Sequence, residues 1–271
     1  MVECVREELA NMEVEMDDRL VRHLANILTR DLIQDYETIP ERIKDTFIYE
    51  IMRATRWGTV KIKIPDFKEG SNWRVEIRTP EMQVLPDENA AFLLFLYLLA
   101  RVFNEREDFN LYIPLTKSHD NYYRSAKRGA VLKERFHFRV NPESLCPAVV
   151  EELSCQEVIF GKGNFRGLFA YIEDYVRNEF DGRPAILKLV ECLRGFLHRL
   201  VTGEKLTTAA WMRRFVQDHP LYQRDSIVPK KVSDDLLQSI EDITRGRIED
   251  PNFRPVFPDW TQKDLDELFS K

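Results

Sequence analysis

The pattern of hydrophobic and polar positions changes from a helical to a strand period within the first third of the chain. Between residues 16 and 36, hydrophobic residues recur at steps of three and four with charges between them: Leu20, Leu24, Ile27, Leu28 and Leu32. This spacing predicts an amphipathic helix. Between residues 59 and 83, hydrophobic and charged residues alternate in two runs, with Val60, Ile62 and Ile64 in the first and Trp73, Val75 and Ile77 in the second. Pro, Asp and Gly occur between the runs, so we expect two antiparallel strands joined by a loop.

The remainder of the chain is predicted to be mostly helical. The hydrophobic stretch at residues 90–103 (AAFLLFLYLLARVF) is too short to span a bilayer and indicates a buried helix. We place this helix at residues 88–106, with Asp87 as its N-cap. Shorter elements should follow: a strand at 110–114, a basic helix at 120–133 and a loop at 140–147. Four further helices are predicted at 165–178, 183–201, 207–218 and 233–246. Residues 250–259 should form an ordered or frayed tail.

Composition and charge exclude several classes of protein. With 271 residues, of which 44% are hydrophobic, the chain can build one large domain or two smaller ones. The net charge of -6 gives no reason to expect nucleic acid as a partner, because such binding depends on neutralising phosphates. The four cysteines are widely spaced and predict neither a zinc site nor a disulfide framework. The acidic N-terminus lacks the hydrophobic core of a signal peptide, so we expect a cytoplasmic protein without a membrane partner.

One row of charges is a candidate for chemistry. Arg74, Glu76 and Arg78 share one face of the second predicted strand, because successive side chains of a strand point to opposite faces. A carboxylate is a hard ligand for Mg²⁺, and an arginine matches phosphate oxygens in shape and charge, so the row suits nucleotide chemistry. The alternative is a set of cross-strand ion pairs on the solvated face of a sheet, and the strand taken alone favours this alternative.

Other polar residues have more ordinary interpretations. A basic stretch with interleaved aromatic residues could attract ATP phosphates or RNA, although a solvated helix face is the simpler interpretation; its cations are Arg124, Lys127, Arg128, Lys133, Arg135 and Arg139. His219 precedes Pro220 and should end a helix, since the residue before proline avoids the helical conformation. The other histidines show no metal-binding spacing: His23, His119, His137 and His198.

Several sequence blocks, in one order, point to a known family. The first is residues 73–83 (WRVEIRTPEMQ), followed by residues 88–90 (ENA). The later blocks are IPLTK at 113–117, AVL at 130–132, FHFR at 136–139, GKG at 161–163, GL at 167–168 and WMRRFVQDHPLYQRDS at 211–226. Together they resemble the C-terminal part of the eukaryotic-type glutamate–cysteine ligase catalytic subunit, from about residue 16 to about residue 246.

The resemblance implies an ATP-dependent enzyme with named site residues. It implies that L-glutamate is phosphorylated on its γ-carboxylate by ATP, and that the amine of L-cysteine attacks to give γ-glutamylcysteine, the first step of glutathione biosynthesis. By position, Glu76 is similar to a metal-binding carboxylate for Mg²⁺ or Mn²⁺. Arg78 is similar to the catalytic arginine that binds ATP at the transferred phosphate. Arg74 and Trp73 are placed to shape the substrate pocket, although the sequence favours a core position for Trp73.

The resemblance also implies a fold and a domain division. We expect an α+β, helix-rich chain that contains an incomplete antiparallel sheet of a glutamine synthetase-like fold. Residues 1–150 should belong to the ligase catalytic core and residues 151–271 to a helical C-terminal region. An incomplete sheet has an unpaired strand edge, so the isolated chain is expected to associate or to require a partner.

Family members have a long N-terminal portion that supplies further acidic metal ligands and part of the glutamate site. The expected partners are therefore this missing half and a regulatory ligase subunit, which Cys146 could approach if it is more than an ordinary loop thiol. Some positions depart from the family pattern: Ile77, Thr79, Pro80, Gly129 and Arg166. The alternative function is a noncatalytic fragment or interaction module that pairs with another ligase subunit.

Overall fold

The computed structural model describes most of the chain after residue 71. The described residues are 60–63, 72–144, 147–180, 183–257 and 260–269, and near the N-terminus Glu3, Arg6, Glu7, Asp17, Asp18, Val21 and Arg22. The chain divides into two compact units, residues 1–79 and residues 80–271, and each is described by itself. The helix predicted at 16–36 falls largely outside the described residues, although Asp18, Val21 and Arg22 within it are helical.

The first unit contains an antiparallel hairpin. β1 (Val60–Lys63) pairs with β2 (Arg74–Ile77), and the register places Val60 opposite Ile77 and Lys63 opposite Arg74. β-branched residues alternate with charged ones in both strands, which gives the sheet one apolar and one charged face. The predicted pair of antiparallel strands is therefore confirmed.

The second unit begins with the long helix α4 (Pro86–Glu105). Its N-cap is Leu85, which has an extended backbone, and Pro86 occupies the first turn, where a missing N–H costs no hydrogen bond. The Asp87 carboxylate accepts the backbone N–H of Val256 instead of capping the helix. The prediction of Asp87 as the N-cap is therefore wrong, because a distant segment takes its side chain.

One face of α4 is buried and the other is exposed. Ala91, Leu98 and Val102 are buried, whereas Leu93 and Tyr97 are each 61% exposed. The helix is therefore confirmed at its predicted position, with one face packed in the core and the opposite face exposed to solvent.

A second hairpin, which the sequence pattern does not predict, follows two short helices. β3 (Phe136–Arg139) pairs antiparallel with β4 (Val150–Leu153), and α5 (Leu115–Ser125) packs against β3. The basic helix predicted at 120–133 is divided into α5 and α6 (Ala130–Lys133) by a break that ends at Gly129, whose φ is 72°.

The strand predicted at residues 110–114 does not form. The backbone N–H of Asn110 donates to Pro142 O, and the Asn110 side chain accepts the N–H of Tyr112, so one loop contact and one local bond replace a strand ladder. The loop predicted at 140–147 is confirmed in its described residues, 140–144 and 147.

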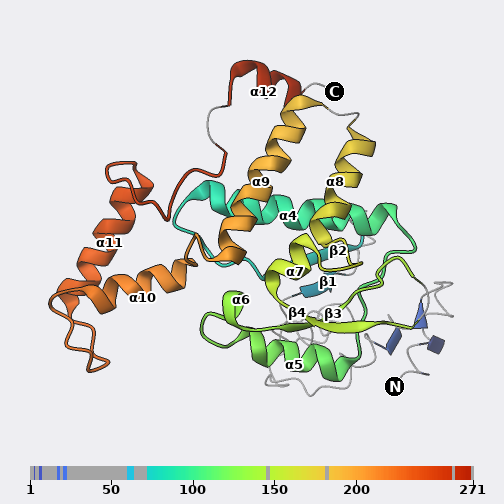
Figure 1. Cartoon of the computed structure of the whole chain (residues 1–271), viewed down its shortest axis with the longest axis horizontal. Helices are drawn as coiled ribbons and strands as arrows, with labels where there is room; N and C mark the ends of the chain where they lie inside the picture. The colour runs from blue at the N-terminus through green and yellow to red at the C-terminus, as the bar shows by residue number, and fades with distance from the viewer. Residues whose placement is uncertain are drawn as a thin grey trace, which may run out of the picture. The chain divides into compact units, whose positions relative to one another are not determined.

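The main core lies where α8 (Leu168–Glu179) and α9 (Pro184–Thr202) pack against α4, and α7 (Cys155–Phe160) packs against α8 and α9. α7 is closed at its start by a reciprocal capping box between Ser154 and Glu157. α8 and α9, both predicted, lie across α4 in Figure 1. Buried side chains of these helices join one cluster, which includes Leu98, Phe169, Ile172, Val176, Leu193, Phe196 and Leu197.

The C-terminal helices complete the second unit. α10 (Thr208–Asp218) and α11 (Lys230–Thr244) pack against each other and confirm two further predictions. His219 is the extended C-cap of α10, as expected for a residue before proline. The segment after α11 is ordered, since Phe253 and Val256 are buried, and it leads to α12 (Gln262–Phe269), which packs against α9.

The described residues are rich in helix and form two small antiparallel sheets, which confirms the α+β class. The glutamine synthetase-like sheet stays a prediction, because the strands described form two separate two-stranded sheets. The domain boundary near residue 150 also stays a prediction; β4 begins at Val150 and pairs with β3 within the second unit. No helix among the described residues is both long and apolar enough to cross a membrane.

Candidate functional site

The charged face of the β1–β2 hairpin holds the candidate metal and phosphate residues. Glu76 lies between two cations: Lys63 Nζ is 3.0 Å from Glu76 Oε2, and Arg78 Nε donates to Glu76 Oε1. The two-residue period of β2 places Arg74, Glu76 and Arg78 on this face, as the sequence predicts. The structure therefore brings Glu76 and Arg78 into direct contact.

The electrostatic environment keeps Glu76 ionised. The hydrogen bond from Arg78, followed by that from Lys63, lowers the pKa of Glu76 to about 2. At neutral pH the side chain is a carboxylate, which is the form that binds a hard cation. Because its side chain is 26% exposed, it is accessible to a ligand from solvent.

Glu76 fits the role of one ligand to Mg²⁺, although not of a complete protein cage. Within the described residues, no group of three or more His, Cys, Asp and Glu side chains could hold a metal. Mg²⁺ commonly uses one or two carboxylates together with waters and substrate phosphates, so a single carboxylate suits it. A bound cation would compete with Lys63 and Arg78 for the two carboxylate oxygens.

Arg74 and Trp73, the two residues predicted to shape the substrate pocket, are both exposed. The Arg74 side chain lies on the charged face, and Arg74 is the backbone partner of Lys63. Trp73 is 44% exposed, so the alternative in which it fills a core is wrong. The neighbouring hydrophobic side chains of β2 are exposed as well, with Val75 62% exposed.

Lys63 is the residue of this site that sequence reasoning missed. It contacts Glu76 diagonally across the hairpin rather than along one strand. The signal was present in the sequence, because Lys61 and Lys63 alternate with the hydrophobic residues of the first strand. Finding it requires the strand register, which depends on how the two strands pair.

The basic stretch of the second unit is largely neutralised by acidic residues. Arg124 lies 2.8 Å from Asp120 within α5 and 2.8 Å from Glu152, and the second contact joins α5 to β4. Two more cations of the stretch are paired, Lys127 with Glu134 and Arg135 with Glu157, and Arg139 is buried. This pairing favours a structural role over binding of ATP phosphates or RNA. His23 and Cys146 lie outside the described residues.

Comparison with known proteins identifies the family. A family model described as glutamate-cysteine ligase matches residues 2–243. A glutamate–cysteine ligase of Dictyostelium discoideum is 32% identical over 252 residues, which cover 90% of this chain and 40% of that protein. The glutamate–cysteine ligase catalytic subunit of Homo sapiens is 31% identical over 266 residues, covering 87% of this chain and 40% of the subunit.

A glutamate–cysteine ligase of Schizosaccharomyces pombe is 29% identical over 248 residues, which cover 87% of this chain and 36% of the yeast protein. The chain thus spans about 40% of the length of the curated relatives it matches. Because the family model matches most of the chain, we conclude that this protein belongs to the glutamate–cysteine ligase family.

Proposed function

We propose that the chain is the C-terminal part of a ligase that joins the γ-carboxylate of L-glutamate to the amine of L-cysteine at the expense of ATP. The observation that carries this proposal is the ionised Glu76 beside Arg78, on the strand that resembles the signature strand of the family. The membership of the family supports the reaction, which yields γ-glutamylcysteine for glutathione biosynthesis.

The residues of the hairpin have distinct roles in this proposal. ATP phosphorylates the γ-carboxylate to give γ-glutamyl phosphate, and the cysteine amine then displaces phosphate. The Arg78 guanidinium binds ATP and stabilises the negative charge of the transferred phosphoryl group. Glu76 holds Mg²⁺ or Mn²⁺, which when bound neutralises charge on the phosphates. Arg74 and Trp73 shape the substrate pocket beside them.

Further parts of the ligase must complete the site. A single carboxylate is too few to position a cation and two amino acid substrates, so the proposal requires acidic residues and a glutamate site from a further portion of the protein or from another chain. A regulatory subunit is a second proposed partner. The thiols of Cys155 and Cys192 are free, which supports a cytoplasmic location.

One observation favours a second candidate function, a noncatalytic module that pairs with another ligase subunit. Both carboxylate oxygens of Glu76 already have a cation as neighbour, Lys63 on one side and Arg78 on the other. Such a cluster can stabilise the hairpin without any ligand. The two functions differ in whether the chain has a use for Mg-ATP.

The deciding experiment measures ATP binding to the purified chain by calorimetry, with and without Mg²⁺, together with γ-glutamylcysteine formation. A ligase site predicts that ATP binds more tightly with Mg²⁺, and that Glu76→Gln removes this Mg²⁺ dependence. Arg78→Lys should weaken ATP binding about tenfold, because a lysine lacks the planar fork of a guanidinium. Glu107→Gln, which removes an exposed carboxylate elsewhere, is the matched control.

Equal ATP binding by the unchanged chain and by Glu76→Gln, at every Mg²⁺ concentration, would contradict the ligase site and support the noncatalytic module. If the unchanged chain forms γ-glutamylcysteine and the Glu76→Gln variant does not, the chain catalyses the reaction by itself.

A further inference from the structure

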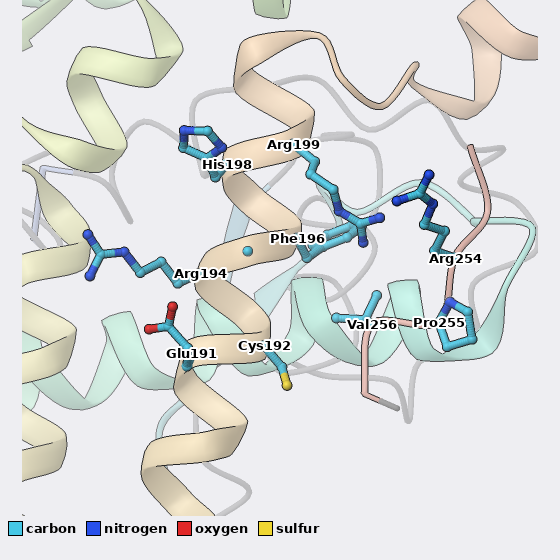
Figure 2. Close-up of a pocket in the computed structure, with 10 residues that line it drawn as sticks. Glu191, Cys192, Arg194, Phe196, His198, Arg199, Arg254, Pro255 and Val256 are labelled. Carbon is cyan, nitrogen blue, oxygen red and sulfur yellow. The ribbon is translucent and has the colours of Figure 1, made fainter. Parts of the chain in front are cut away.

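Two adjoining pockets in the second unit share a pair of arginines. The pockets have volumes of about 710 Å³ and about 960 Å³, and both are lined by Arg199 and Arg254. Arg199 belongs to the last turn of α9, and Arg254 belongs to the segment that follows α11. Figure 2 shows the Arg199 side chain reaching from α9 towards the guanidinium of Arg254. Two positive charges therefore face one space from different elements.

Neither guanidinium forms an ion pair with an acidic side chain in the part of the chain that the structure describes. The buried Glu88 carboxylate attracts Arg199 through space, but its ion-pair partner is Lys205. Nearby carboxylates have other partners: Glu204 lies beside His198, Asp218 beside Arg214, and Asp250 accepts the indole N–H of Trp211. Arg194, one turn earlier on α9, differs in this respect. It also lines the smaller pocket, but it lies 2.9 Å from Glu173 and projects to the other side of the helix in Figure 2.

The backbone around Arg254 is held in place by contacts that do not involve its side chain. The Asn252 side chain accepts the N–H of Leu206 at 2.6 Å, and its backbone carbonyl accepts Lys205 Nζ at 3.0 Å. Phe253 and Val256, on either side of Arg254, are buried. The backbone positions of both arginines are thus fixed by α9 and by this anchored segment, which limits how far the like charges can move apart.

We propose that Arg199 and Arg254 bind the phosphate group of a small molecule. Two guanidinium groups present paired N–H donors that match phosphate oxygens, and their combined charge matches a dianion. The pocket volumes are in the range of small-molecule sites. The apolar side chains of Pro255 and Val256 line the smaller pocket and can contact the organic part of a phosphate ester.

Stabilisation of the helix end does not explain the pair. A cation in the last turn of α9 interacts favourably with the helix dipole, and this accounts for Arg199 alone. Arg254 is not part of a helix, and its charge adds repulsion to Arg199. An anion between the two side chains removes that repulsion.

The test is calorimetric titration of the full chain with inorganic phosphate and, separately, with phenyl phosphate, at constant ionic strength set by chloride. Saturable binding is expected, and Arg199→Gln and Arg254→Gln should each weaken it about tenfold. Arg245→Gln, which removes an arginine paired with Glu241 and lining neither pocket, should leave the affinity unchanged. Tighter binding of phenyl phosphate would identify an ester as the ligand, and equal or weaker binding would identify free phosphate.

A second site for phosphate is proposed at Arg78, so the titration is repeated in an Arg78→Gln background, where binding at the pocket should persist. Circular dichroism of each variant without ligand verifies that the helices are intact. Absence of saturable binding would overturn the proposal. An equal loss of affinity in Arg245→Gln, or a loss confined to Arg78→Gln, would overturn it as well.

Discussion

At the scale of single residues, the second unit contains a buried ion pair. Glu88 and Lys205 have side chains that are 1% and 2% exposed, and Lys205 Nζ lies 2.6 Å from Glu88 Oε1. Lys205 also donates to Asn252 O and lies 4.6 Å from the ring centre of Phe253. Burial raises the pKa of Glu88, and the Lys205 ammonium acts in the opposite direction. The pair therefore links the start of α4 to the segment that carries Arg254.

Removing one partner of this pair should destabilise the protein strongly. Glu88→Gln leaves the Lys205 ammonium buried without its counter-charge, so the free energy of unfolding should fall by about 3 to 5 kcal/mol in urea titrations. The double variant Glu88→Leu with Lys205→Met removes both charges and should recover much of this loss. Lys127→Met, which removes a cation from an exposed ion pair, should change the free energy of unfolding little. A Glu88→Gln protein as stable as the unchanged chain would contradict the assignment.

At the scale of elements, the turn between α7 and α8 depends on two glycines whose backbones touch. Gly161 has a φ of 99° and Gly167 a φ of 82°, a region that side chains disfavour. A Cβ on Gly167 would lie 2.4 Å from Gly161 N and 2.5 Å from Phe160 C, which leaves no room for it. This contact fixes the angle at which α8 enters the core.

Gly167→Ala should therefore destabilise the protein by more than about 2 kcal/mol, because it adds both backbone strain and a clash with backbone atoms. The measurement is the free energy of unfolding by urea. Gly195→Ala is the matched control, since Gly195 lies within α9 and a Cβ there meets no atom within 4 Å. That change should stabilise the helix by about 0.5 to 1 kcal/mol. A similar effect of both changes would contradict the role of the turn.

The elements also show which local patterns predict structure. α8, α9, α10 and α11 lie close to their predicted ranges, because each has several turns of amphipathic sequence. β3, β4 and α7 are four to six residues long and contain too few positions to establish a period. The break between α5 and α6 at Gly129 was not predicted either, because the run of charged residues continues on both sides of it.

At the scale of the whole molecule, the two units differ in how they are stabilised. The second unit, residues 80–271, contains its own hydrophobic core, in which helices α4, α8 and α9 meet. In the first unit, the described hairpin has two strands with exposed hydrophobic residues, including Val60 and Val75. An isolated two-stranded hairpin is marginally stable, and exposed hydrophobic residues on strands favour association.

A chain restricted to residues 80–271 should therefore fold and unfold cooperatively on heating, as followed by circular dichroism. It should remain monomeric at concentrations where the full chain associates, as measured by sedimentation velocity. In the full chain, Val75→Lys should reduce association by placing a charge on the apolar face of the hairpin. Equal association of the fragment and the full chain would show that the hairpin is not responsible.

The sequence by itself determined the helix-rich α+β class, the β1–β2 hairpin and the family, because each depends on short-range periodicity or on ordered sequence blocks. It also placed Arg74, Glu76 and Arg78 on one face, since that follows from the strand period alone. Only the tertiary structure decided that Lys63 pairs with Glu76, that Asp87 binds Val256, and that Arg199 and Arg254 share a pocket. These contacts join residues far apart in the sequence or depend on strand register, and no local pattern specifies which distant segment a side chain will meet.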